Sequence, residues 1–119
     1  MENVADKIKK RQRILIEYLE ELAHEQNTSL GSTPDCEVII DTQHNHFQLT
    51  RIGWHDRKYN FYVLMHLSIK PDGKVWIQKN NTEILIDEDL ERRGIPKSEM
   101  VLGFRPEYWR AMSDEFAVA

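Results

Sequence analysis

The histidines His44 and His46 are the residues whose types and spacing most readily suggest chemistry. They lie in the stretch DTQHNHFQL, residues 41–49, which begins with Asp41. Zinc needs three or four His, Cys or carboxylate ligands that converge on the ion. A zinc site here would therefore require both imidazoles and the carboxylate of Asp41 to point to one centre.

The residues around these histidines favour a turn over a metal site. The segment TQHN is polar turn sequence between two β-type runs. If His44 lies in the turn and His46 starts the following strand, their side chains need not converge. We therefore predict that this stretch is the first hairpin of a sheet, without a metal and without any other cofactor.

No motif of covalent catalysis or phosphate binding is found in the sequence, which lacks a G-x-S-x-G elbow and a glycine-rich phosphate loop. The single cysteine, Cys36, begins an apolar run and is expected to be a buried, unreactive thiol. One cysteine cannot form an internal disulfide, which agrees with the reducing cytoplasm. We expect a non-enzymatic cytoplasmic protein, although acid-base pairs formed only in space stay open.

A second candidate surface combines aromatic residues with a histidine. By strand alternation, and subject to register, Trp54, Tyr62, His66 and Trp76 are expected to share the face of the sheet that is not the main core. Such a face would bind a partner or a ligand, which would suit a small ligand-binding or enzymatic domain. The alternatives are a second small core under the C-terminal segment and an interface between copies of the chain.

A third candidate is the basic cluster near the N-terminus, formed by Lys7, Lys9, Lys10, Arg11 and Arg13. It could bind phosphate or an acidic partner, or it could be an ordinary solvated helix face. The chain carries a formal net charge of -4, whereas stand-alone nucleic-acid binders usually have a basic excess. Direct DNA binding is therefore the less favoured reading, and we expect any DNA contact to be local, weak or made through a partner.

These residues must be positioned by a small number of elements. Apolar residues at helical spacing, such as Leu15, Leu19 and Leu22, predict a helix over 4–26, followed by a loop at 26–35. Strict alternation from Tyr59 to Ile69 predicts a strand with one core face. The connections are too short for crossover helices, so we expect an antiparallel meander of strands at 36–42, 46–54, 59–70 and 74–79.

Short helices are expected after the sheet. Thr82 can cap a helix over 83–92, with Gly94 just beyond its end, and residues 106–112 predict a last short helix. The apolar tail EFAVA should dock on its own domain or on a partner. With 119 residues the chain fits one α+β domain, 1–119: a long N-terminal helix packed on a four-stranded antiparallel meander sheet, followed by short C-terminal helices. No apolar run is long enough to cross a membrane.

Several separate motifs resemble one family. The stretches DTQHNHFQL, GW, KVWIQ, GIPKSEMVLGF and the terminal FAVA occur in the order found in XisI-like proteins, which are described as fdxN element excision controlling factors. Within the first stretch, Asp41 and the run from His46 to Leu49 fit the family pattern, while His44 falls among its variable turn positions. The segment EILIDEDL is more acidic and aliphatic than the family pattern.

The resemblance implies a small α+β fold and a role in programmed DNA rearrangement during heterocyst differentiation in cyanobacteria. It implies that a separate site-specific recombinase performs the strand chemistry and that XisI-type and XisH-type proteins act as accessory factors. We therefore expect an XisH-like protein or the recombinase complex as partner. The wide apolar face of the first helix and the apolar tail are also compatible with a homodimer.

Overall fold

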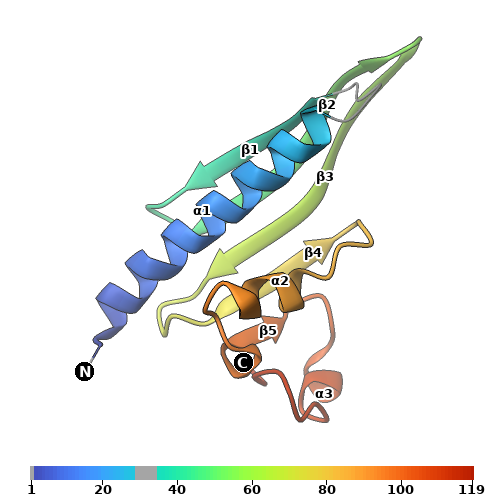
Figure 1. Cartoon of the computed structure of the whole chain (residues 1–119). Helices are drawn as coiled ribbons and strands as arrows, with labels where there is room; N and C mark the ends of the chain where they lie inside the picture. The colour runs from blue at the N-terminus through green and yellow to red at the C-terminus, as the bar shows by residue number, and fades with distance from the viewer. Residues whose placement is uncertain (1, 29–34) are drawn as a thin grey trace.

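A long helix, α1 (Val4–Thr28), lies across a five-stranded sheet (Figure 1). The computed structural model describes residues 2–28 and 35–119, so most of the loop expected at 26–35 falls outside the described residues. The other elements are β1 (Asp35–Asp41), β2 (His46–His55), β3 (Lys58–Ile69), β4 (Val75–Asn80), α2 (Ile86–Arg92), the 3-10 helix η1 (Lys97–Glu99), β5 (Met100–Leu102) and α3 (Glu107–Arg110).

The predicted α+β class and the four-stranded antiparallel meander are confirmed. Strands β1 to β4 follow one another in sheet order, and each pairs antiparallel with the next. The meander depends on tight turns: Gly73, at φ +89°, allows the turn between β3 and β4, and Asn45, at φ +60°, allows the turn between β1 and β2.

The fifth strand was not predicted. Strand β5 has three residues and pairs parallel with β4, in the register Val75↔Met100. Three residues are too few to show an alternating pattern, so no strand was expected there. The connection through α2 supplies the long crossover that a parallel pair needs, so the sheet is mixed.

The core lies between the sheet and the two helices α1 and α2. Because apolar residues recur at helical spacing along α1, one side of that helix is buried, and β2 and β3 turn alternate residues toward it. The buried residues include Leu15, Tyr18, Leu19, Phe47, Leu49, Met65, Leu67, Ile86 and Leu90. The opposite face of β1–β3 is covered by no element of the described chain (Figure 1), and it is termed the open face below.

An extra residue in β3 decides which side chains reach the open face. Leu49 pairs with Met65 but Thr50 pairs with Val63, so Leu64 is a β-bulge. Leu64 and Met65 both face the core, at 7% and 0% exposure. The alternation therefore reverses at this point along the strand.

The reversal corrects the uninterrupted alternation that the sequence predicted for this strand. Tyr59 and Phe61, expected in the core, lie on the open face and are 50% and 64% exposed. Tyr62, expected on the second face, lies beside Arg51 on the side of α1. A single-residue bulge leaves no mark in the composition of a strand, so the pattern alone could not reveal it.

Helix α2 is shorter than predicted at its start. Thr82 does not cap it; its hydroxyl donates to Asn80 Oδ1 at 2.5 Å and accepts from the Ile84 backbone at 3.1 Å. This local turn competes with helix formation, and α2 begins four residues later, at Ile86. The predicted end is confirmed, since Gly94 follows the helix at φ +110°.

A buried tyrosine joins the two helices. Tyr18 is 1% exposed, and its hydroxyl donates to Asp89 Oδ2 on α2 at 2.6 Å. Burial, followed by the hydrogen bond to Asp89, raises the pKa of Tyr18 far above its usual value. The Arg93 guanidinium lies 4.8 Å from the Tyr18 ring centroid, so a cation covers the same junction.

The C-terminal segment folds back on the sheet, as expected for its apolar sequence. The backbone N–H of Ala117 donates to Met100 O at 2.8 Å, and Phe116 packs partly against the core. Helix α3 confirms the short helix predicted for 106–112. In the described part of the chain no helix is both long and apolar enough to span a membrane.

Candidate functional site

The two histidines of the first hairpin do not converge. His44 Nδ1 lies 2.7 Å from Asp41 Oδ2, and Asp41 Oδ1 accepts hydrogen bonds from the backbone N–H groups of Gln43 and His44. These bonds, first of all the one from the His44 backbone, hold the pKa of Asp41 below its usual range. These contacts stabilise the turn between β1 and β2, which the polar residues of this segment predicted.

His46 instead joins a polar chain on the open face. Its Nδ1 lies 3.1 Å from His66 Nε2 and 3.2 Å from Ser68 Oγ. The chain continues from His66 Nδ1 to Gln48 Oε1 at 2.9 Å, and the Gln48 amide donates to Thr50 Oγ1 at 2.7 Å. Among the described residues, no group of three or more His, Cys, Asp or Glu side chains could hold a metal ion.

Within this polar chain of side chains, His66 is hard to protonate. Burial, and then the neighbouring His46, lower the pKa of His66 below its ordinary value, which is about 6.5. As the pH falls below about 6.5, the unfolded chain takes up the His66 proton before the folded chain does, so folding becomes less favourable. The contribution to stability is complete above the unfolded pKa and is lost as the pH falls toward the folded pKa.

His66→Gln is therefore expected to flatten the pH dependence of stability. The wild-type chain should lose more of its free energy of unfolding than the variant between about pH 7.5 and about pH 5. Urea denaturation at both pH values measures the difference. His24→Gln, a change at an exposed helix position, is the matched control and should follow the wild type. Equal losses for wild type and His66→Gln would contradict the assignment.

The four residues of the predicted aromatic surface do not lie together. His66 is on the open face, where it pairs with Gln48, and Trp76 is on the same side of the sheet but on β4, where it pairs with Ser68. Trp54 is on the same face at the far end of the β2–β3 hairpin, where its ring centroid lies 5.2 Å from that of Tyr59. Tyr62 is on the opposite face because of the bulge.

Trp76 belongs to a cluster under the C-terminal segment. The guanidinium of Arg110, from α3, and the Lys70 ammonium each lie 5.3 Å from its ring centroid. Val101, its partner on β5, is fully buried. For Trp76 alone, this agrees with the alternative of a small second core under the C-terminal segment. The sequence does not show which strand the C-terminal segment covers, so it could not single out Trp76.

The basic cluster is divided by its contacts. Arg11 is buried, and its Nη1 donates to Gly73 O at 2.7 Å and to Glu99 Oε1 at 3.0 Å. Lys7 Nζ lies 3.2 Å from the same Glu99 oxygen. Arg11 therefore ties α1 to the β3–β4 turn and to η1, Lys7 ties it to η1, and neither cation is available to a phosphate. The exposed residues of the cluster are Lys9, Lys10 and Arg13.

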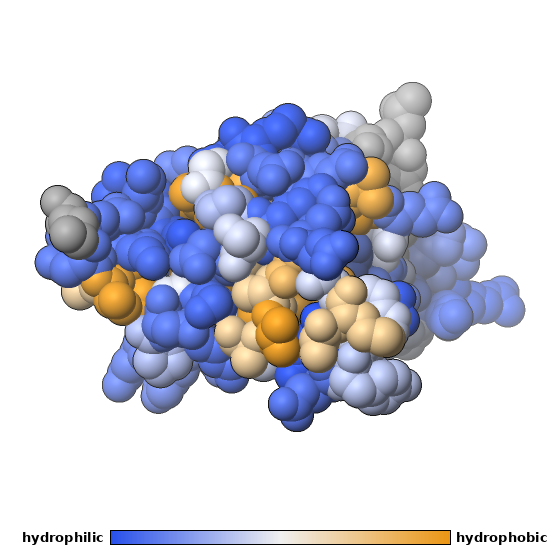
Figure 2. All heavy atoms as spheres, turned by 90° about the horizontal axis from the view of Figure 1, so that it is seen from below, coloured by the Kyte–Doolittle hydropathy of each residue, from blue (hydrophilic) through white to orange (hydrophobic). Residues whose placement is uncertain are grey.

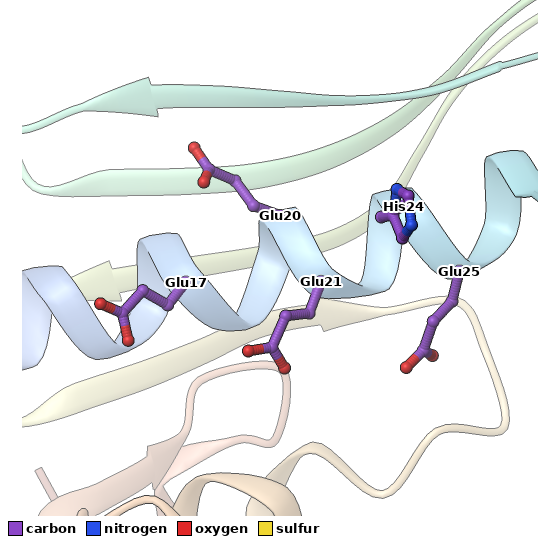
Figure 3. A pocket seen from close by; sticks show the side chains of 5 residues that line it. All are labelled: Glu17, Glu20, Glu21, His24 and Glu25. Carbon is purple, nitrogen blue, oxygen red and sulfur yellow. The ribbon is translucent and has the colours of Figure 1, made fainter.

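The C-terminal half of α1 carries acidic residues around a shallow hollow (Figure 3). Glu17, Glu21 and Glu25 project on one side of the helix, as their four-residue spacing requires, and Glu20 projects on the other (Figure 3). A hydrogen bond from Arg93 lowers the pKa of Glu21. We regard this as a solvated helix face that also contacts the end of α2.

Cys36 is buried, as predicted. Burial raises the pKa of its thiol, so the nucleophilic thiolate is disfavoured. The Asn27 side chain bonds both the N–H and the C=O of Cys36, at 2.7 and 2.9 Å. Asn27 thereby satisfies both backbone hydrogen-bonding groups of Cys36 near the start of the edge strand β1.

Comparisons with known proteins agree with the sequence motifs. The family model described as XisI protein matches residues 5–118. A crystal structure of the fdxN element excision controlling factor XisI from Anabaena variabilis ATCC 29413 is 28% identical with a TM-score of 0.76, over 96% of this chain and 100% of that chain. A XisI-like protein from the same organism is 29% identical with a TM-score of 0.67, over 87% and 98%. No curated protein matches.

Proposed function

The chain belongs to the XisI family, and we propose on that basis that it is a controlling factor for programmed excision of an fdxN-type DNA element. The observation that carries this proposal is the similarity along nearly the whole chain to a protein named as an excision controlling factor. We place the activity in the cytoplasm of a cyanobacterium during heterocyst differentiation, with a separate site-specific recombinase cutting and joining the DNA.

We infer that the protein acts without catalysis of its own. Several ionisable residues that first suggested a site have structural partners: Arg11 and Lys7 hold Glu99, and Asp41 holds the first turn. Tyr18 and Asp89 join the helices. These contacts support an accessory role, in which the chain works by binding other proteins, chiefly an XisH-like partner.

The C-terminal segment is the surface that we assign to this partner. Figure 2 shows apolar side chains gathered over it, on the face seen from below. Tyr108 and Met112 are 73% and 71% exposed. The Arg105 guanidinium lies 4.8 Å from the Trp109 ring centroid, and an ordered arginine among exposed aromatic residues is typical of binding hot spots.

Met112→Asp is expected to weaken binding to an XisH-like partner at least about tenfold, because a buried charge in an apolar contact is costly. Co-purification of tagged protein from cells that carry both genes, followed by titration, measures the change. Leu85→Asp is the matched control, since Leu85 is 59% exposed but directly precedes α2 and is not part of the C-terminal segment. If Met112→Asp binds like wild type, the assignment of this surface to the partner is wrong.

If the wild type neither co-purifies with such a partner nor alters excision frequency, the proposed function fails.

Contact with DNA is proposed to be indirect. Two of the five clustered cations are used inside the fold, and the formal net charge of the chain is -4. Binding driven by phosphate contacts weakens steeply as salt rises. The isolated protein should therefore give no gel shift with element DNA over a salt series, and a shift that fades with salt would favour direct DNA binding instead.

A further inference from the structure

The open face of β1–β3 has no formal charge at its centre. From His46 to Trp54 on β2 and from Tyr59 to Ser68 on β3, no side chain on this face is Asp, Glu, Lys or Arg. The chain as a whole is 30% charged. Charged residues are depleted in this way at the centres of protein interfaces, whereas solvated sheet faces are usually polar.

The same face exposes large apolar side chains. Trp54 and Phe61 are each 64% exposed, Tyr59 is 50% exposed and Ile39 on β1 is 48% exposed. The rings of Trp54, Tyr59 and Phe61 form a row, with centroid separations of 5.2 and 6.5 Å. Rings that already contact one another lose little conformational freedom on binding, so this row is suited to recognition.

We propose that this face packs against the same face of a second copy of the chain, forming a two-fold symmetric dimer. Nucleic acid would require cations that the centre of the face lacks, and a charged peptide would require opposite charges. A second copy brings an equally uncharged surface, so an isologous contact creates no repulsion at its centre. The charges that border it are Asp35, Glu37 and Asp41 on the edge strand β1 and Lys79 on β4, which pairs with His66, and they lie where an interface has its polar rim.

The face is large enough to form the central part of a dimer interface. Strands β1, β2 and β3 have 7, 10 and 12 residues. At about 4.8 Å between strands and about 3.3 Å per residue, they present a flat footprint of roughly 450 Å². This is more than half of the about 800 Å² that each partner buries in a standard interface, and the projecting rings add to it. Two such sheets would stack about 10 Å apart, as in a β-sandwich.

Light scattering coupled to size exclusion tests the proposal on the full chain. We expect the wild type to have twice the mass of one chain at about 50 µM and Phe61→Asp to be monomeric, with a dissociation constant raised at least about 100-fold. Both this residue and its neighbour Tyr62, which is 39% exposed, are accessible enough for the variants to fold, which circular dichroism verifies.

Tyr62→Asp is the matched control, because it places the same charge one residue away on the opposite side of the sheet, and it should remain dimeric. Met112→Asp should also remain dimeric, which separates this face from the proposed partner surface. A monomeric wild type would overturn the proposal. So would a dimer that survives Phe61→Asp, or one that Tyr62→Asp disrupts equally.

Discussion

Replacing Arg11 with methionine is expected to lower the free energy of unfolding by about 2–3 kcal/mol. Only 9% of the Arg11 side chain is exposed, and its partner Glu99 is 25% exposed. Methionine keeps most of the aliphatic packing but leaves the Gly73 carbonyl and one bond to Glu99 unsatisfied. The partial exposure of Glu99 places the cost below that of a fully buried pair.

The pKa of Glu99 shows which interaction prevails at this junction. Burial acts to raise the pKa of the carboxyl group, but the hydrogen bonds from Arg11 and Lys7 outweigh it and the net pKa is lowered. The carboxylate is therefore held in its charged form by the two cations. Removing Arg11 leaves Lys7 alone to offset the burial.

A double-mutant cycle separates the pair from the loss of packing. Urea denaturation of Arg11→Met, Glu99→Gln and the double variant should give a sum of single effects larger than the double effect. Arg13→Met, at an exposed position two residues away, should change stability by no more than about 0.5 kcal/mol. If Arg11→Met costs no more than Arg13→Met, the junction contributes nothing to stability.

The elements encoded by local signals were predictable from sequence. Leu15, Leu19 and Leu22 mark one side of α1 by their spacing, and the turn residues Asp72 and Gly73 mark the β3–β4 hairpin. Each signal depends on a few neighbouring residues and on backbone geometry that their types favour. The family motifs added the identity of the chain, because they combine several such signals in order.

The properties that depend on distant neighbours were not predictable. The bulge at Leu64 is decided by how β2 and β3 pair along their whole length, and it moved Phe61 out of the core. Arg11 looked like part of a basic surface until the fold placed Glu99 beside it. A sequence shows the charge of a side chain but not whether a residue 88 positions away neutralises it.

Phe47 lies at the centre of the stretch that first suggested a metal site, and its replacement is expected to have the largest effect on stability. It is fully buried on β2, between His46, which is exposed, and Gln48, which is half-buried. Phe47→Ala should lower the free energy of unfolding by about 3–5 kcal/mol, because lost transfer energy and a cavity add together. That loss is comparable with the whole stability of a marginal domain.

Phe47→Leu keeps the prediction measurable if the alanine variant does not fold, because leucine fills part of the volume of the ring, leaves a smaller cavity than alanine and should cost about 1.5 kcal/mol. His46→Ala is the neighbouring control and should cost less than about 1 kcal/mol, because His46 is exposed and its hydrogen bonds compete with water. Equal losses for His46→Ala and Phe47→Ala in urea denaturation would mean that the histidine, not the aromatic ring, holds this strand. Residues 41–49 would then again be a candidate for a functional site. A much larger loss for Phe47→Ala, as expected, identifies them as a structural hairpin whose polar side chains lie on the open face.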